Sequence, residues 1–205
     1  MERISQTKRE DIRSKYGIAS EKFCVVSCGN AEWRKGIDLF LLVAAQHVKE
    51  KSNLPLLFVW VGMPQEGILW EQVIYDVKRL GLDEICLFIP PIPHAIELMA
   101  SMDVFLLPSR EDPFPLVMLE AALAEKPIIG FEHTGGCTEF VGKEAGIIVP
   151  YGDTQKMYQE IVRLYEHPII AQSIAQKAID NVRTKYTFDA SMLKIEQLMI
   201  EMTQP

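Results

Sequence analysis

The stretch Ser109-Arg-Glu-Asp-Pro-Phe-Pro-Leu-Val-Met-Leu-Glu120 joins the exit of a strand to the start of a helix. The segment that leads into it, Asp103-Val-Phe-Leu-Leu-Pro108, is apolar and short, as a buried parallel strand should be. Pro108 ends that strand because proline has no amide to donate to a neighbouring strand. In parallel sheets, ligands bind just beyond the carboxyl ends of such strands, so a functional site is expected in this stretch.

The second half of the stretch has the features of a helix start. Pro115 suits the first turn of a helix, where its missing amide would be unpaired in any case, and good helix formers follow over residues 116–125. The unpaired amides of this turn, at Leu116 and Val117, lie at the positive end of the helix dipole. They predict a site for an anion such as a diphosphate, with an ordinary loop and helix as the alternative.

Similar apolar runs recur along the chain and alternate with helical stretches. Leu56-Leu-Phe-Val-Trp-Val61 is unbroken, which is typical of a strand buried on both faces. The expected strands lie near residues 23–28, 56–61, 85–89, 103–107, 127–130 and 146–149. This alternation predicts an α/β fold with a Rossmann-like, doubly wound, six-stranded parallel sheet.

Two further turns follow expected strands. The first runs from Gly29 to Gly36 and leads into an amphipathic helix over residues 37–50, whose apolar residues recur at helical spacing. The second contains Gly135 and Gly136, which can adopt positive φ at little steric cost and let the chain bend closely beneath a ligand. Both turns are expected at the same edge of the sheet as the stretch after Pro108.

Two carboxylates, Asp112 and Glu120, frame the start of the expected helix. With the proline-rich turn between them, they resemble the donor-side signature of nucleotide-sugar-dependent retaining glycosyltransferases with the GT-B fold, specifically family 4, in which the first acid is usually Glu. The resemblance implies catalytic roles for both residues. Glu120 would hold the ribose hydroxyls through charge-assisted hydrogen bonds worth about 1.5–3 kcal/mol each. A solvent-facing helix glutamate is the alternative for Glu120.

The resembled family also supplies a basic pair to the donor phosphates from the turn after its first strand. Its arginine follows a glycine directly, and its lysine lies five positions later. Here Gly29 and Lys35 match, Asn30 stands in the arginine position, and Arg34 is the residue that could restore the missing charge. The resemblance implies that Lys35 stabilises the departing diphosphate. The alternative is that Arg34 and Lys35 form a solvated surface pair.

The same resemblance points to three other positions. Gly135 lies in the turn beneath the ligand, and Glu139 occupies the position of the family's usual glutamate. Ile89 ends the strand whose following loop lines the nucleoside base in the family, largely through backbone groups. The alternative for Glu139 is a first-turn acid favoured by the helix dipole, and for Ile89 it is a core strand residue.

Composition sets limits on the class of protein. The 205 residues suit one domain, with residues 1–15 expected as a linker or disordered start and residues 16–205 as the nucleotide-sugar-binding domain. The net charge of −7 argues against nucleic acid as a partner. The four cysteines fit neither a zinc motif nor a disulfide framework, which indicates a cytoplasmic setting, and no apolar run has the length of a transmembrane segment. No metal or cofactor is expected, because the sequence has no Asp-x-Asp pair to hold a divalent cation.

The resemblance implies the C-terminal, donor-binding domain of a retaining glycosyltransferase that uses a UDP-, GDP- or ADP-sugar. Its partner would be an N-terminal acceptor-binding domain, without which the chain should bind donor but barely transfer it, and through which the enzyme could sit peripherally at a membrane. Two other functions stay open: a nucleotide-binding or scaffold module without transferase activity, and a sugar-nucleotide epimerase of the same fold. The last expected helix, over residues 189–202, has an apolar stripe whose expected role is core packing, with contact to the partner domain as the alternative.

Overall fold

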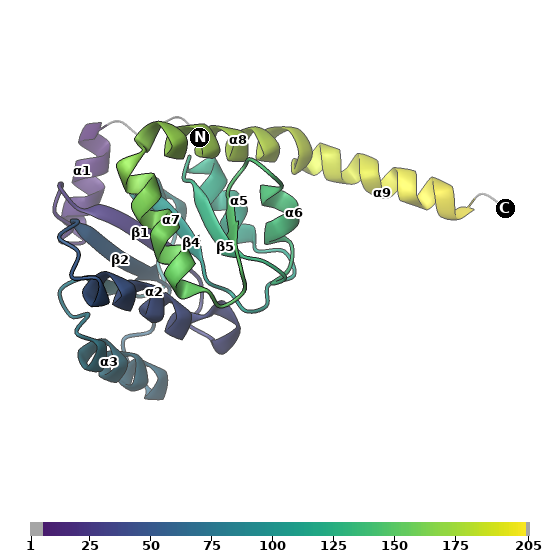
Figure 1. The fold of residues 1–205 in the computed structure, drawn as a ribbon. Helices are drawn as coiled ribbons and strands as arrows, with labels where there is room; N and C mark the ends of the chain where they lie inside the picture. The colour runs from purple at the N-terminus through teal and green to yellow at the C-terminus, as the bar shows by residue number, and fades with distance from the viewer. Residues whose placement is uncertain (1–5, 204–205) are drawn as a thin grey trace.

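One parallel sheet forms the centre of the computed structural model, which describes residues 6–203 (Figure 1). The strands lie in the order β3-β2-β1-β4-β5-β6, so the direction in which the sheet grows reverses between β1 and β4. Their bounds are β1 (Phe23–Cys28), β2 (Leu56–Val61), β3 (Cys86–Ile89), β4 (Val104–Leu107), β5 (Ile128–Phe131) and β6 (Ile147–Val149). The predicted doubly wound, six-stranded α/β fold is confirmed.

The helices are α1 (Gln6–Lys15), the short 3-10 helix η1 (Trp33–Lys35), α2 (Ile37–Lys49), α3 (Ile68–Leu80), α4 (Ala95–Ala100), α5 (Leu116–Leu123), α6 (Cys137–Val141), α7 (Thr154–Glu166), α8 (Pro168–Lys185) and α9 (Phe188–Thr203). Successive residues of a strand point to opposite sides of the sheet, and here both sides are apolar, so helices cover both faces. In β1, Val25 belongs to the core that includes α2, α3 and α7, whereas Val26 belongs to the core that includes α1, α4, α5 and α6. The sheet is therefore the middle of three layers.

Local signals set several helix ends. The Asp153 carboxylate accepts a hydrogen bond of 2.8 Å from the Lys156 amide and so caps the start of α7, as the Gly-Asp-Thr turn indicates. Helix α3 ends at Gly81, which adopts a φ of 68° in the left-handed region that glycine accepts without strain.

The N-terminal segment differs from the predicted linker. Residues 1–5 lie outside the described part of the chain, but residues 6–15 form α1. The Arg13 guanidinium is buried, and it donates to the Ser101 carbonyl at 2.8 Å and to the Asp103 carboxylate at 2.7 Å. These partners lie almost ninety positions away, so the charged composition of the segment gave no sign of them. Helix α1 is part of the folded domain.

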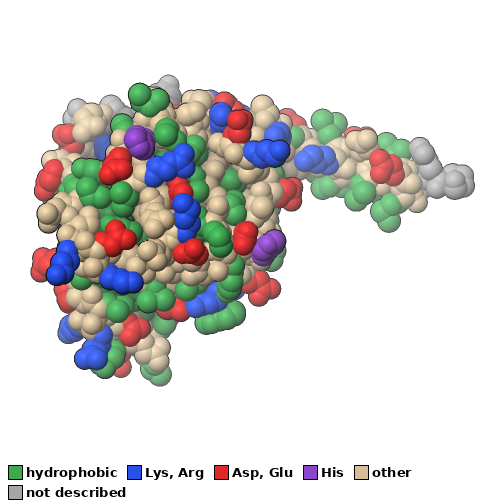
Figure 2. Space-filling model, viewed as in Figure 1, with side chains coloured by type: hydrophobic (Ala, Val, Ile, Leu, Met, Phe, Trp, Pro, Cys, Tyr) green, Lys and Arg blue, Asp and Glu red, His purple; other side chains and the backbone are tan. Residues whose placement is uncertain are grey.

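The expected core packing of the last helix is also wrong. Helix α9 projects from the body of the molecule (Figure 1), and none of its residues is buried. Figure 2 shows hydrophobic side chains along this projecting helix. An apolar stripe indicates that a helix face can be buried, but it does not indicate what buries it. Other helices already cover both cores of the described residues, so α9 packs on neither. Within residues 6–203, no helix combines the length and the apolar character that a membrane span requires.

Candidate functional site

The loops that follow β1, β4 and β5 interlock at the carboxyl edge of the sheet. The Arg110 amide donates to the Arg34 carbonyl at 2.8 Å, which joins the loop after β4 to the turn after β1. The Asp112 amide donates to the Thr134 carbonyl at 2.7 Å, which joins the same loop to the turn after β5. Because β1, β4 and β5 are neighbours in the sheet, three segments far apart in sequence form one surface.

Two glycines allow these loops to approach one another. Gly36 adopts a φ of 73°, and a Cβ atom there would lie 2.1 Å from the Pro108 carbonyl oxygen. Gly135 adopts a φ of 126°, and a Cβ atom there would lie 1.9 Å from the Asp112 carbonyl oxygen. No larger residue fits either position without a backbone shift. The first contact places η1, and therefore Lys35, against the exit of β4.

Lys35 and Asp112 meet at this edge. The Lys35 ammonium forms an ion pair with the Asp112 carboxylate, and their side chains are only 14% and 9% exposed. An Arg34 guanidinium nitrogen lies 3.8 Å from the other Asp112 oxygen. Arg34 also pairs with the Glu32 carboxylate at 3.1 Å, so two cations and two carboxylates meet where the sequence predicted a basic pair. Arg34 is the residue that brings the second charge.

Gly29 lies directly beneath Lys35. A Cβ atom on Gly29 would lie 3.7 Å from Lys35 Cε, so the lysine stem passes over the glycine backbone. The Gly29 carbonyl accepts a hydrogen bond of 3.0 Å from the Trp60 indole, which fixes this peptide against β2. Asn30, the residue in the family's arginine position, is exposed to solvent.

Glu120 lies on the same side of the molecule as Lys35. The pKa of the Cys28 thiol is raised to about 11, first by burial and then by the Glu120 carboxylate, while the Lys35 ammonium opposes the rise. Both charges therefore lie close to the end of β1, where Cys28 is half-buried. The exposed Glu120 carboxylate and the Lys35 ammonium thus both act on the thiol at the end of β1.

The start of α5 offers free backbone donors beside these charges. Pro115 is the residue before the helix, not its first residue, and its side chain provides no cap. Within residues 6–203, the amides of Leu116 and Val117 find no acceptor, and the Met118 amide is the first to bond, to the Pro115 carbonyl at 3.0 Å. Leu116 is 68% exposed, so the helix start faces solvent. This is the anion-binding geometry of a helix N-terminus.

Two predicted residues lie apart from this group. Ile89 ends β3, two strands away from β1, where its side chain is buried in the core and its carbonyl accepts the amides of Gly62 and Met63. Glu139 lies in the first turn of α6. Burial raises the pKa of Tyr186, and the Glu139 charge raises it further. The structure therefore brings Glu139 toward the end of α8. We find neither residue in contact with Lys35 or Asp112 among the described interactions.

Sequence reasoning missed the role of Arg110. Its guanidinium donates to both oxygens of Asp38 at 2.8 and 2.6 Å and to the Trp33 carbonyl at 2.8 Å, and it lies 5.0 Å from the centre of the Trp33 ring. The hydrogen bond from Arg110 lowers the pKa of Asp38. Arg110 thus clamps η1 against the loop after β4. Its partner Asp38 is 72 positions away, so no local pattern marks the pair.

The chemistry of this edge is that of anion binding. Among the described residues, no three His, Cys, Asp or Glu side chains gather into a group that could hold a metal ion. The positive charges at this edge are Lys35, Arg34 and the positive end of α5, and they lie beside the Glu32 and Asp112 carboxylates. The chain thus belongs to the doubly wound α/β class and gathers positive charge at the carboxyl edge of its sheet.

The comparison with known proteins narrows this class to one family. The chain belongs to the family described as Glycosyl transferases group 1, whose model matches residues 8–181. The match confirms the family resemblance that Asp112, Glu120 and Lys35 carry in the sequence.

Individual relatives are distant. The D-inositol 3-phosphate glycosyltransferase of Saccharomonospora viridis is 24% identical over 190 residues, which cover 89% of this chain and 44% of that protein. Anabaena Alr3699/HepE in complex with UDP and glucose superposes with a TM-score of 0.80 at 22% identity, over 98% of this chain and 53% of that one. The C-terminal domain of the glycosyl transferase group 1 family protein LpcC from Francisella tularensis superposes with a TM-score of 0.73 at 22% identity, over 91% of this chain and 95% of that domain. These structures share the fold.

The chain is short relative to its curated relatives. It covers 14% of the exopolysaccharide phosphotransferase SCO2592 of Streptomyces coelicolor and 48% of the N-acetyl-alpha-D-glucosaminyl L-malate synthase of Bacillus anthracis. It therefore spans about half of their length or less.

Proposed function

We propose that this chain is the donor-binding domain of a retaining glycosyltransferase that takes a sugar from a nucleoside diphosphate sugar. The observation that carries the proposal is the meeting of Lys35, Arg34 and Asp112 at the carboxyl edge next to the unpaired amides of α5. Support comes from the family match and from the UDP and glucose named in the complex of Alr3699/HepE, which has the same fold.

In this proposal the diphosphate lies against the amides of Leu116 and Val117. Lys35 and Arg34 neutralise part of its charge, and Lys35 stabilises it as the leaving group when the sugar departs. Electrostatic stabilisation of developing negative charge is commonly the largest catalytic contribution, and removal of one donor costs about 2.7–4 kcal/mol in a well-studied case. The donor is a UDP-, GDP- or ADP-sugar.

The remaining residues surround the diphosphate. Glu120 holds the ribose hydroxyls, and Asp112 faces the sugar side of the donor. Gly29, Asn30 and Gly135 provide backbone close to the ligand, since the glycines leave no Cβ in the way. We keep Ile89 as a backbone contact of the base and Glu139 as a donor contact, although each lies apart from Lys35.

The proposal also includes a partner domain. The chain spans about half of its relatives, and its α9 carries an exposed apolar face. An N-terminal acceptor-binding domain would supply the acceptor site and a surface for that face, so the chain alone is expected to bind donor without efficient transfer. We place the protein in the cytoplasm, in keeping with four cysteines that are all free, with the partner domain as the source of any peripheral membrane contact.

Calorimetric titration with UDP, GDP and ADP tests the proposal. At least one of these should bind with a dissociation constant below about 1 mM, and Lys35→Ala and Glu120→Ala should each weaken that binding by about tenfold or more. Lys49→Ala and Glu71→Ala remove the same charges at exposed positions of α2 and α3 and should leave the affinity unchanged. Absence of binding for all three nucleotides at millimolar concentration contradicts the donor-site proposal.

One observation favours the scaffold module as a second candidate. In the family the acidic residue at the position of Asp112 is usually Glu, whereas here the shorter Asp112 pairs with Lys35 and occupies the cation that a diphosphate would need. A module that no longer binds nucleotides would show no heat with any nucleoside diphosphate and yet be folded. The same titration therefore separates the two functions.

A further inference from the structure

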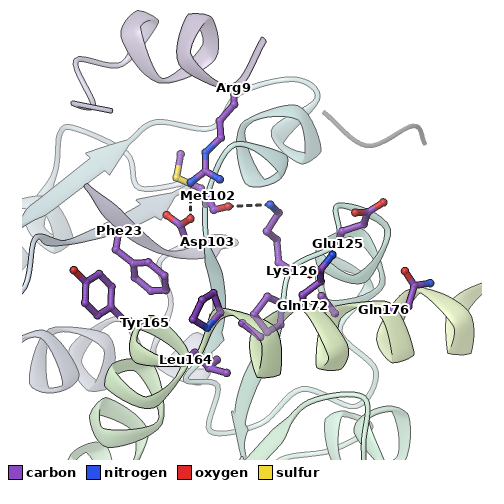
Figure 3. A pocket seen from close by; sticks show the side chains of 14 residues that line it. Arg9, Phe23, Met102, Asp103, Glu125, Lys126, Leu164, Tyr165, Gln172 and Gln176 are labelled. Atoms are coloured by element: carbon purple, nitrogen blue, oxygen red, sulfur yellow. Dashed lines mark hydrogen bonds and ion pairs between the residues drawn. The ribbon is translucent and has the colours of Figure 1, made fainter. Parts of the chain in front are cut away.

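A cavity of about 390 Å³ lies at the opposite end of the sheet from the candidate donor site (Figure 3). It opens where β1, β4 and β5 begin, between those strand starts, the end of α7, the face of α8 and Arg9 of α1. Strands of four residues separate it from the carboxyl edge, a distance of about 13 Å. A ligand in this cavity would therefore be distinct from the sugar donor.

Lys126 places a buried cation in the wall of this cavity. The residue is 8% exposed, and its ammonium donates one hydrogen bond, of 2.9 Å, to the Met102 carbonyl (Figure 3). An ammonium group has three donors. Among the interactions of the described residues, no ion pair joins Lys126 to a carboxylate. A buried charge that is not paired is costly, and burial lowers the pKa of Lys126 to about 8.

Two acids, Asp103 and Glu125, line the cavity with Lys126. Their charges raise the pKa of Lys126 against the effect of burial, whereas the Arg9 and Arg13 charges lower it further. One Asp103 oxygen accepts from Arg9, and the other accepts from Arg13 at 2.7 Å and from the Cys24 amide at 2.7 Å. Asp103 thus balances the arginines of α1 and does not contact Lys126. Pro168, at the first position of α8, also lines the cavity, so the positive end of that helix dipole faces it. Around the cavity the cations Arg9, Arg13 and Lys126 outnumber the carboxylates of Asp103 and Glu125.

The remaining walls fit a small organic body. Phe23 and Tyr165 pack edge to face with their ring centres 5.2 Å apart and line one side together with Leu164. Gln172 and Gln176 of α8 line another side and offer amide groups (Figure 3). The volume lies at the small end of the usual range for ligand sites, which is about 300–1,000 Å³.

We propose that this cavity binds a small organic anion, a single phosphate or carboxylate on an apolar body, with the anionic group on Lys126 and the body against Phe23 and Tyr165. Binding would supply the counter-charge that Lys126 lacks and bury the exposed edges of the two rings. The proposal is independent of the donor site, because it uses none of the residues at the carboxyl edge.

Phenyl phosphate is the probe for this site, with inorganic phosphate as its counterpart without an apolar body. By calorimetry at pH 7, phenyl phosphate should bind with a dissociation constant below about 10 mM and at least about threefold more tightly than inorganic phosphate. Its affinity should fall as the pH rises through 8, because the Lys126 ammonium then loses its proton. Absence of binding, or equal affinity for both probes, overturns the proposal.

Variants test whether the heat measured on titration with phenyl phosphate comes from binding in the cavity. Lys126→Met should weaken phenyl phosphate binding by about tenfold or more, whereas Lys49→Met, at an exposed position, should not. Ala171→Phe fills the cavity from α8 and should have the same effect as Lys126→Met, whereas Ser173→Phe on the same helix points outside the lining and should not. If circular dichroism shows that Lys126→Met does not fold, Ala171→Phe alone provides the test of binding in the cavity. Binding that survives Ala171→Phe but is lost in Lys35→Ala would place the probe at the carboxyl edge and contradict the proposal.

Discussion

At the scale of single residues, one carboxylate controls the positive charge at the carboxyl edge. Asp112 pairs with Lys35 and lies near Arg34, so both cations are partly neutralised before any ligand arrives. A diphosphate must compete with Asp112 for them. Solvent-exposed ion pairs are worth about 0–1 kcal/mol, and the Lys35–Asp112 pair is mostly buried and less screened, so the competition should be at least of that size.

Asp112→Asn tests this competition. Removal of the charge should strengthen binding of UDP, which lacks the donor sugar that Asp112 would face, by about threefold or more. Calorimetric titration of UDP provides the measurement. Asp76→Asn, which changes the net charge equally at an exposed position of α3, should leave the affinity as it is. Weaker UDP binding in Asp112→Asn would show that the carboxylate helps to hold the nucleotide.

At the scale of elements, the turn that presents Lys35 depends on a close backbone approach. Gly36 and Gly81 have nearly the same φ, 73° and 68°, but only Gly36 has a neighbouring atom within reach of a Cβ, the Pro108 carbonyl oxygen at 2.1 Å. The two positions therefore form a matched pair. A side chain has the same conformational cost at both, but it clashes with a neighbouring atom only at Gly36.

Gly81→Ala should lower the free energy of unfolding by about 1–2 kcal/mol, the usual cost of a left-handed alanine. Gly36→Ala should lower it by about 3 kcal/mol or more, because the clash adds to that cost. Urea denaturation of both variants provides the comparison. Equal losses would mean that the turn after β1 adjusts without strain, and that its position relative to β4 is loosely set.

The contact between α2 and α7 should make stability depend on pH. His47 of α2 is buried and lies 3.2 Å from the Tyr158 hydroxyl of α7. Burial lowers the pKa of His47, the Lys22 charge lowers it further, and the Glu50 charge opposes this. The unfolded chain therefore takes up a proton at a higher pH than the folded chain, so the stabilising contribution is complete above pH 6.5 and is lost as the pH falls through the folded pKa.

The free energy of unfolding should thus decline as the pH falls below about 6.5, by up to about 1.4 kcal/mol per pH unit. His47→Gln keeps a hydrogen-bonding group for Tyr158 but cannot titrate, so it should flatten the curve in this pH range. His167→Gln, at an exposed position, should keep the slope of the parent chain. A slope that survives His47→Gln would assign the effect to other groups.

The elements differ in how well the sequence predicts them. The strands were predicted closely because strands buried on both faces leave unbroken apolar runs, such as residues 56–61. Helix α1 was missed because its burial rests on the hydrogen bonds of Arg13 to residues distant in sequence. Helix α5 ends at Leu123, two residues before the predicted end, since Glu125 adopts a φ of 57° and the Lys126 amide returns to the Ala121 carbonyl.

The sequence predicts the candidate site only where the strands that precede its residues are neighbours in the sheet. Lys35, Asp112 and Gly135 follow β1, β4 and β5, which are neighbours, so residues at the ends of these strands meet. Ile89 is the last residue of β3, at the edge of the sheet, and does not join them. The clamp of Arg110 on Asp38 depends on the packing of a loop against a helix, for which the sequence carries no periodic signal.

At the scale of the whole molecule, the projecting helix α9 should contribute little to the free energy of unfolding of the body. Helix α9 has no buried residue, whereas α8 buries Ala175, Ala178, Ile179 and Val182 against the body. The apolar face of α9, which includes Phe188, Met192 and Met199, is exposed. Apolar surface of this kind is typical of a contact surface for a partner, and under the proposed function that partner is the acceptor-binding domain.

A chain that ends at Thr187, and so lacks α9, should retain its free energy of unfolding to within about 1 kcal/mol, because little packing is removed. Binding of a dye that fluoresces on apolar surfaces should fall at the same time. A chain that ends at Ser173 loses the buried part of α8 and should unfold. Urea denaturation measures both, and a loss of several kcal/mol on removal of α9 alone would show that the helix packs on the body in solution.

The central claim is that a diphosphate docks on the free amides at the start of α5 beside Lys35. Amide chemical shifts of the ¹⁵N-labelled chain during titration with UDP report on this contact directly. The account predicts that the Leu116 and Val117 amides shift strongly and saturate together with the amides of the turn from Gly29 to Gly36. If UDP saturates the protein while these helix amides stay unmoved, the nucleotide binds elsewhere and the account is wrong.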